Sequence, residues 1–208
     1  MGLVLVTPPT GPALLNSDAK LHARITYADE DSEITALIQA AQRYYEQVAG
    51  VQLCTATYDQ FWHSLPRSEA NLQLHQDLAP WGNGKLWIDR PPLVSVTWIK
   101  YYDDTQTLQT LDPSLYQVDA TGQRGFIVPA AGQLWPEMYP GLLNAFNVRF
   151  VCGFDAPQGS NVPATALHYM REWVCRHFKE EGREGGTKDP EPPGMEALFW
   201  AERCLDFV

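Results

Sequence analysis

The chain has 208 residues, of which 45% are hydrophobic and 19% charged, and its formal net charge is −10. This balance is typical of a globular protein and excludes a disordered chain. No long segment is basic overall, which disfavours tight binding to a nucleic-acid backbone. The apolar runs are far shorter than the ~18 residues that span a bilayer, and the first residues lack the basic region typical of a signal peptide. We therefore expect a protein that is soluble and intracellular when made, with no membrane partner.

The first part of the chain predicts an arm and then a short helix. Residues 1–16 contain a cluster of Pro and Gly, which is typical of an extended arm. Asn16, Ser17 and Asp18 offer cap oxygens, so a helix is expected over about 17–27.

Two longer helices are predicted from apolar residues that recur every 3.6 residues. The first begins within an acidic run at 29–33 and ends at Gly50, and the second begins near Pro163. Packed together, these helices form a bundle. The residues expected in its core are Leu37, Ile38, Ala41, Tyr45, Leu167, Met170, Trp173 and Val174.

Between these helices the pattern changes to short runs rich in β-branched and aromatic residues, separated by Pro, Gly, Asn and Asp. The expected strands are 55–65, 85–88, 93–102, 115–118, 125–128 and 145–151. Asp103 and Asp104 are expected to begin a hairpin turn, and residues 66–84 to form a long irregular insertion. Such strands predict an antiparallel sheet or a small sandwich.

The end of the chain predicts a linker and a docking helix. Residues 185–194 are rich in Pro and Gly, and the helix beyond them is apolar over most of its circumference. Such a helix needs a partner groove, or else it folds back on the bundle of its own subunit. The expected docking residues are Met195, Leu198, Phe199 and Trp200.

Together these elements predict an α+β fold, in which a β domain is inserted into a small helical bundle. The bundle combines the N-terminal helix pair with the long helix after the β domain, and a C-terminal arm follows. The predicted parts are an N-terminal arm at 1–16, the bundle at 17–50 and 155–184, the antiparallel β domain at 51–154, and the linker and docking helix at 185–208.

No motif in the sequence predicts chemistry. Phosphate-binding loops, dinucleotide fingerprints and nucleophile elbows do not occur. The histidines at 22, 63, 75, 168 and 177 have no ligand spacing, and the cysteines at 54, 152, 175 and 204 lie far apart. We therefore expect no enzyme, no catalytic residue, no cofactor and no metal site.

Several stretches occur in an order that carries a family resemblance. They are LNSDAKLHARI at 15–25, DEDSEITALIQAAQRYYEQVAG at 29–50, IDRPPLVSVTWIKYYDD at 88–104, LDPSLYQVD at 111–119, GFIVPA at 125–130, VRFVCGFD at 148–155 and VPATALHYMREWVCRHFKEEGRE at 162–184. Through them the chain resembles the head-to-tail connector (portal adaptor) proteins of tailed phages and gene transfer agents. The insertion at 66–84 and the Pro-rich linker with its apolar helix depart from that pattern.

The resemblance implies a structural subunit without catalysis. It implies a ring of about twelve copies under the portal protein, which extends the DNA channel and joins the capsid to a stopper or tail terminator. It places the protein in the virion neck, made in the host cytoplasm. Double-stranded DNA would pass without sequence-specific binding, which the acidic composition suits. Two alternatives are a carbohydrate- or host-binding module of a phage particle, suggested by the many tryptophans, and an unrecognised hydrolase.

Overall fold

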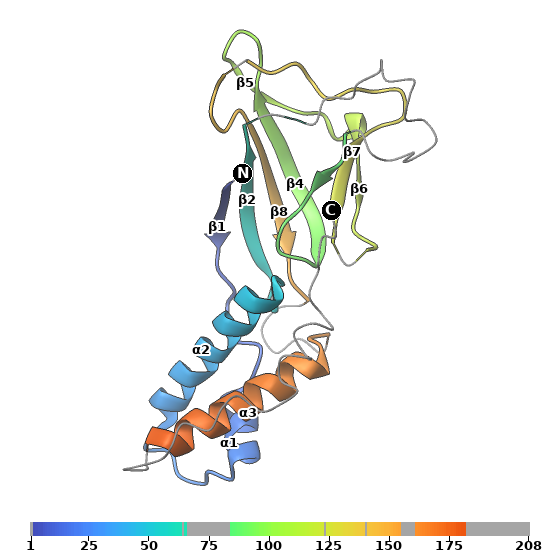
Figure 1. The fold of residues 1–208 in the computed structure, drawn as a ribbon. Coiled ribbons are helices and arrows are strands. Elements are labelled where there is room, and N and C mark those ends of the chain that lie inside the picture. The colour runs from blue at the N-terminus through green and yellow to red at the C-terminus, as the bar shows by residue number, and fades with distance from the viewer. Residues whose placement is uncertain are drawn as a thin grey trace. The chain divides into compact units, whose positions relative to one another are not determined.

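The structure, a computed structural model, describes residues 2–63, 65, 84–122, 124–139, 141–154 and 161–181. It divides the chain into two compact units. Residues 1–8 and 56–152 form the first, called here the β unit, and residues 9–55 and 153–208 form the second, the helical unit. The expected α+β class is confirmed, with three α-helices and two antiparallel sheets in the described ranges (Figure 1).

The larger sheet of the β unit has five antiparallel strands in the order β1-β2-β8-β4-β5. Their bounds are β1 Gly2–Thr7, β2 Ala56–Trp62, β8 Phe146–Cys152, β4 Leu93–Tyr102 and β5 Leu108–Thr110. Two of these strands, β1 and β5, were not predicted. The expectation of an extended arm is wrong for the first residues, because Leu3 to Thr7 pair with Gln60 to Thr57 of β2.

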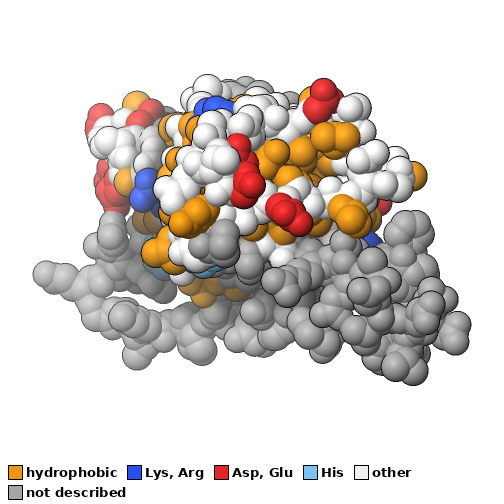
Figure 2. Space-filling view, turned by 90° about the horizontal axis from the view of Figure 1, so that it is seen from above, with side chains coloured by type: hydrophobic (Ala, Val, Ile, Leu, Met, Phe, Trp, Pro, Cys, Tyr) orange, Lys and Arg blue, Asp and Glu red, His pale blue; other side chains and the backbone are white. Residues whose placement is uncertain are grey.

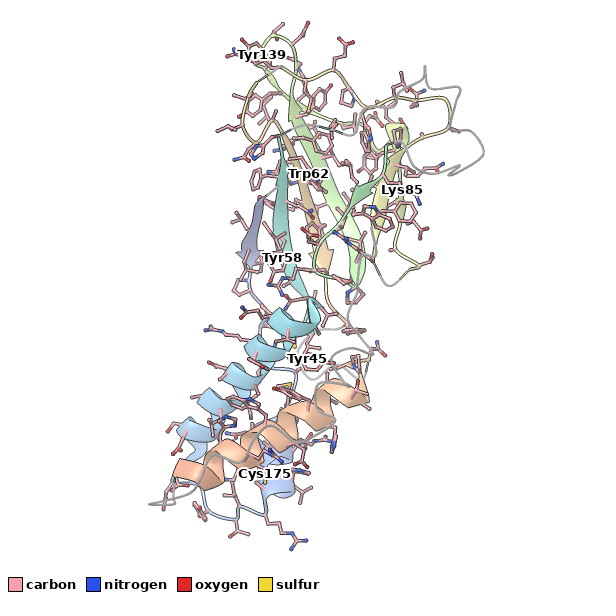
Figure 3. All side chains as sticks on the ribbon, viewed as in Figure 1. Tyr45, Tyr58, Trp62, Lys85, Tyr139 and Cys175 are labelled. Carbon is pink, nitrogen blue, oxygen red and sulfur yellow. The ribbon has the colours of Figure 1, made fainter. Side chains whose placement is uncertain are left out.

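A second sheet has three antiparallel strands in the order β3-β7-β6. Its strands are β3 Leu86–Trp87, β7 Phe126–Pro129 and β6 Tyr116–Asp119, which follows the short 3₁₀ helix η1 at Pro113–Leu115. Apolar residues of both sheets share one core, which contains Trp62, Leu86, Ile88, Leu93, Ile99, Leu111, Ile127, Phe146, Val148, Phe150 and Cys152. Figure 3 labels Trp62 within this unit.

A partly buried set of polar contacts joins the two sheets. The side chain of Gln60, which is fully buried, donates to the Trp87 carbonyl at 3.2 Å and to the Asp89 carboxylate at 3.2 Å. In return, the Asp89 N–H donates to the Gln60 amide oxygen at 3.0 Å. Arg124 completes the link with a 2.6 Å ion pair to Asp89. Because each polar group has a partner, the link fixes the relative position of the sheets at little desolvation cost.

The helical unit contains α1 at Asn16–Ala23, α2 at Asp31–Ala49 and α3 at Ala164–Glu181. The first helix ends earlier than predicted, because Arg24 adopts a left-handed φ of 59° and its N–H and that of Ile25 bond back to the last turn. The second helix stops at Gly50, as predicted, with φ 70°.

All three helices contribute to a single core, and Figure 3 labels one of its members, Tyr45. Of the expected core residues, the fully buried ones are Ile38, Ala41, Tyr45, Met170 and Val174. The other three, Leu37, Leu167 and Trp173, are partly buried and pack against them. Tyr45 and Tyr169 lie with ring centroids 5.5 Å apart at this centre.

Glu46 fixes the chain that follows α2. One of its carboxylate oxygens accepts hydrogen bonds from Gln42, from Gln52 and from the backbone N–H of Leu53, at 3.0 to 3.1 Å. Gln42 in turn accepts from the Ala13 N–H at 2.9 Å. These bonds hold two irregular segments against α2, where local sequence carries no regular pattern.

Candidate interaction surfaces

The two faces of the five-stranded sheet differ in chemistry. Along β8 the side chains alternate strictly, with every even-numbered residue buried and every odd-numbered residue only half-buried. The buried face packs into the core of the β unit. The other face is more open, and Asn147, Arg149 and Val151 project from it.

A charged and aromatic row crosses this open face at one level of the sheet. Register places Val4, Asp59, Arg149 and Trp98 side by side on four neighbouring strands. The guanidinium of Arg149 donates to both carboxylate oxygens of Asp59, at 2.7 and 2.8 Å. Its central carbon lies 4.8 Å from the Trp98 ring centroid, and the Lys100 ammonium lies 4.5 Å from the same ring. The row is a preorganised polar surface with apolar neighbours.

Burial distinguishes the two members of the ion pair. The side chain of Asp59 is only 11% exposed, whereas that of Arg149 is 32% exposed. The hydrogen bond from Arg149 to Asp59 raises the pKa of the Arg149 guanidinium above the usual value. The carboxylate therefore depends on this partner for its charge compensation, and the guanidinium keeps one side toward solvent.

The edge strand β1 exposes consecutive apolar side chains. Its exposed fractions are 53% at Val4, 47% at Leu5 and 39% at Val6. Within the described ranges, β1 pairs only with β2 and no strand lies along its outer side. An exposed apolar edge of this kind is typical of a contact with another chain.

The end of the β unit that carries the β4–β5 turn is apolar and acidic. Figure 2 views this end and shows apolar side chains beside several carboxylates. Leu108, Leu134 and Leu143 are 50%, 66% and 74% exposed. Asp103 and Asp104, in the turn between β4 and β5, add negative charge at this end.

Asp103 organises the turn at that end, as the sequence predicts for a hairpin. Its carboxylate accepts from the N–H and hydroxyl of Thr105, from the Thr107 N–H and from the Gln109 amide, at 2.7 to 3.0 Å. These bonds, led by the Thr105 hydroxyl, lower the pKa of Asp103 to about 2. The turn is therefore rigid and negatively charged.

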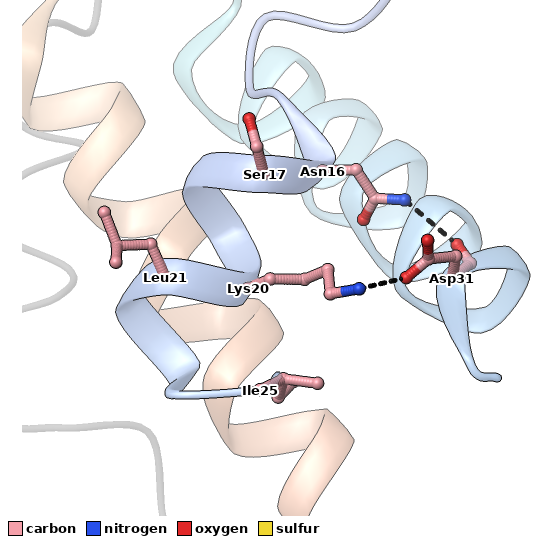
Figure 4. A pocket seen from close by; sticks show the side chains of 6 residues that line it. All are labelled: Asn16, Ser17, Lys20, Leu21, Ile25 and Asp31. Atoms are coloured by element: carbon pink, nitrogen blue, oxygen red, sulfur yellow. Dashed lines mark hydrogen bonds and ion pairs between the residues drawn. The ribbon is translucent and has the colours of Figure 1, made fainter. Parts of the chain in front are cut away.

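The helical unit has a shallow pocket of about 440 Å³ beside α1 (Figure 4). The ammonium of Lys20 lies 2.6 Å from the Asp31 carboxylate there, and Asn16 donates to the Asp31 carbonyl at 3.2 Å. Leu21 is 80% exposed at the same place. Because the ammonium is bound by the carboxylate, the pocket does not favour a ligand of either charge.

The histidines and cysteines of the described ranges occupy separate places. His22 bonds to Glu172 at 3.0 Å, His63 accepts from Asn144 at 3.0 Å, and His177 stacks on Trp173. Cys54 and Cys152 are buried, and burial raises the pKa of Cys54 to about 11. In the described part of the chain, no group of three His, Cys, Asp or Glu side chains is placed to hold a metal ion. The same part contains no helix long and apolar enough to cross a membrane.

Sequence reasoning missed the surfaces of the β unit. The docking residues expected at Met195, Leu198, Phe199 and Trp200 lie outside the described residues, as does His75. The row around Arg149 had no sequence signal, because its members come from four strands and Asp59 is 90 positions away. The alternation in 146–152 could have indicated an open sheet face.

Comparison with known proteins gives a likeness of fold. No protein-family model matches the chain, and no curated protein is similar in sequence. Among solved structures, a chain from the neck of an empty GTA particle, computed with C6 symmetry, has a TM-score of 0.74 at 18% identity. A chain from the virion of a native gene transfer agent (GTA) particle has a TM-score of 0.73 at 18% identity.

A third chain, from the neck of a native GTA particle computed with C12 symmetry, has a TM-score of 0.69 at 16% identity. Each match covers 100% of this chain and 98% of the other. At this level of identity the likeness defines the class of fold, an α+β fold shared with chains of GTA particles.

Proposed function

We propose that this chain is a structural connector (adaptor) subunit that joins head to tail in a phage-like particle. The observation that carries the proposal is the match over the full length of both chains to chains from GTA necks and virions. The order of sequence stretches from 15 to 184 supports it independently. Its place in the particle is the neck, between capsid and tail.

In this proposal the subunit acts as one segment of a ring. The necks that contain similar chains were computed with C6 and C12 symmetry, which suits a ring of about twelve copies. The ring extends the DNA channel below the portal protein. A net charge of −10 lowers non-specific affinity for DNA, so the DNA can pass without being held.

We assign two surfaces of the subunit to different partners. The C-terminal helix around Phe199 and Trp200 docks on the portal protein, because its broad apolar surface needs a groove and the Pro-rich linker gives it reach. The apolar and acidic end of the β unit, with Leu134 and Leu143, contacts the next neck protein, a stopper or tail terminator. Such an end fits a partner that presents apolar and basic side chains.

The described tryptophans favour this function over carbohydrate binding. Sugar stacking requires an open aromatic face, but Trp98 is covered by two cationic side chains. Trp87 is 40% exposed, but the Lys85 ammonium and the Arg124 guanidinium lie 5.5 and 5.6 Å from its ring centroid, and Phe126 packs edge-on against it. Trp135 donates to the Gly84 carbonyl at 2.7 Å and packs on the core. We therefore assign these residues structural roles, with no catalysis and no cofactor.

Particles produced without this chain test the connector role. We expect DNA-filled capsids and complete tails that remain unjoined, and restoration of joined particles when the chain is supplied in trans. A point variant of a surface outside the proposed contacts, such as Leu21→Ser on α1, serves as the matched control and should join heads to tails normally. Joined, infectious or transducing particles without the chain would contradict the proposal.

A further inference from the structure

The five-stranded sheet exposes apolar side chains at both of its edges. On one side β1 exposes Val4, Leu5 and Val6. On the other side β5 pairs only with residues 100–102 of β4, and the preceding stretch of β4 has Val94 at 54% exposure. In the described ranges, no strand pairs with the outer side of either stretch. Each edge can therefore accept another chain.

The two open edges lie at the same level of the sheet. Following the register across β2 and β8, Leu3 is level with Ile99, Val4 with Trp98, and Thr7 with Ser95. The open part of β4, residues 94–98, therefore has the same height and nearly the same length as β1. A second copy moved sideways, without a shift along the strands, brings one edge against the other.

Strand direction also suits this contact. Three antiparallel steps separate β1 from β4, so the two strands run in opposite directions. Copies related by rotation about an axis along the strands thus bring β1 of one copy antiparallel to β4 of the next. A two-fold contact of β1 with β1 would leave the Val94 edge exposed. Two unlike edges make a heterologous contact, the type that generates closed rings.

The open part of β4 is not a regular ladder. Its register against β8 shifts between Leu93 and Ser95 and again between Val96 and Trp98. Each shift interrupts the sequence of main-chain donors and acceptors and twists the edge. Burial of the apolar side chains will therefore contribute more to the contact than main-chain hydrogen bonds.

We propose that β1 of one copy packs along residues 94–98 of β4 in the next copy. Val6, at the register shift between Leu5 and Thr7, then lies next to Ser95. This inference rests on the proposed function, since a ring subunit needs two unlike contact surfaces. It identifies the partner of both edges as a second copy of this chain.

A disulfide between copies tests the contact directly. We would assemble the full chain carrying Val6→Cys and Ser95→Cys with portal protein and oxidise it gently. Within one copy these positions are three strand spacings apart, about 14 Å, which a disulfide cannot span. Any new bond must then join two copies. We expect a ladder of covalent multimers under denaturing conditions, at least tenfold above the background of the unsubstituted chain.

Single variants and a control pair separate the possible arrangements. Neither Val6→Cys nor Ser95→Cys alone should form a product above background. A strong dimer from Val6→Cys alone would show a two-fold contact and overturn the proposal. The pair Val6→Cys with Val118→Cys uses a residue of β6 that is also 39% exposed, and it should give no ladder.

A charge substitution distinguishes this inference from the proposed function. Leu5→Lys should reduce ring yield at least tenfold, while Leu115→Lys, at an exposed position in η1 and outside both edge strands, should not. Rings that form normally but give no ladder and tolerate Leu5→Lys would overturn the inference and leave the connector role in place. The absence of any ring with portal protein would overturn both.

Discussion

Replacing Gly153 by alanine should destabilise the helical unit strongly. Gly153 has φ +117°, and a Cβ there would lie 2.6 Å from the Cys54 carbonyl oxygen and 2.8 Å from the Thr55 Cα. These are backbone atoms and cannot rotate away. The left-handed conformation costs about 1–2 kcal/mol with a side chain, and a forced backbone shift adds about 1–3 kcal/mol. We therefore expect a loss of about 3 kcal/mol or more.

Gly50→Ala is the matched control, because Gly50 also has a positive φ, +70°, but a Cβ there meets nothing within 4 Å. Only the conformational cost applies, about 1 kcal/mol. Urea denaturation followed by helical circular dichroism gives both free energies of unfolding. A difference of about 2 kcal/mol between the variants supports the packing argument. Equal losses for Gly153→Ala and Gly50→Ala would refute it.

Three further predictions concern charge and docking. Arg149→Met leaves the nearly buried Asp59 carboxylate without its partner, so urea denaturation should show a loss of about 2 kcal/mol, and no loss would contradict the role of the pair. The Asp103 carboxyl should titrate near pH 2 by NMR. Because its pKa is lowered in the folded protein, its contribution to stability is complete above pH ~4 and is lost as the pH falls toward 2. A titration midpoint near pH 4 would contradict the hydrogen bonds described for this turn. Phe199→Ala or Trp200→Ala should weaken portal binding about 30-fold, equivalent to ~2 kcal/mol, with little change in subunit stability; portal binding that survives removal of the whole linker and helix would exclude the arm as the anchor.

The sequence predicts most regular elements because their apolar period is local. In α2 the stripe from Ile34 to Tyr45 recurs every turn, and Gly50 marks the end. The six predicted strands are all present, within a few residues of their expected bounds. The end of α1 could not be predicted, because Arg24 takes the left-handed conformation there without a glycine to indicate it.

Long-range pairing explains what sequence reasoning missed. β1 follows the pattern of an arm, since most of its side chains are exposed and its partner strand lies about fifty residues later. The same reason hides the Asp59–Arg149 pair, whose members meet only when β2 and β8 align. Contacts of this kind depend on register, which no local period encodes.

Native mass spectrometry of the full chain with purified portal protein tests the central claim most directly. The connector role predicts a complex whose added mass is about twelve times the 23.4 kDa of one subunit. The Leu21→Ser control should give the same mass. A portal that gains no mass, or gains single subunits without a ring, would contradict the account.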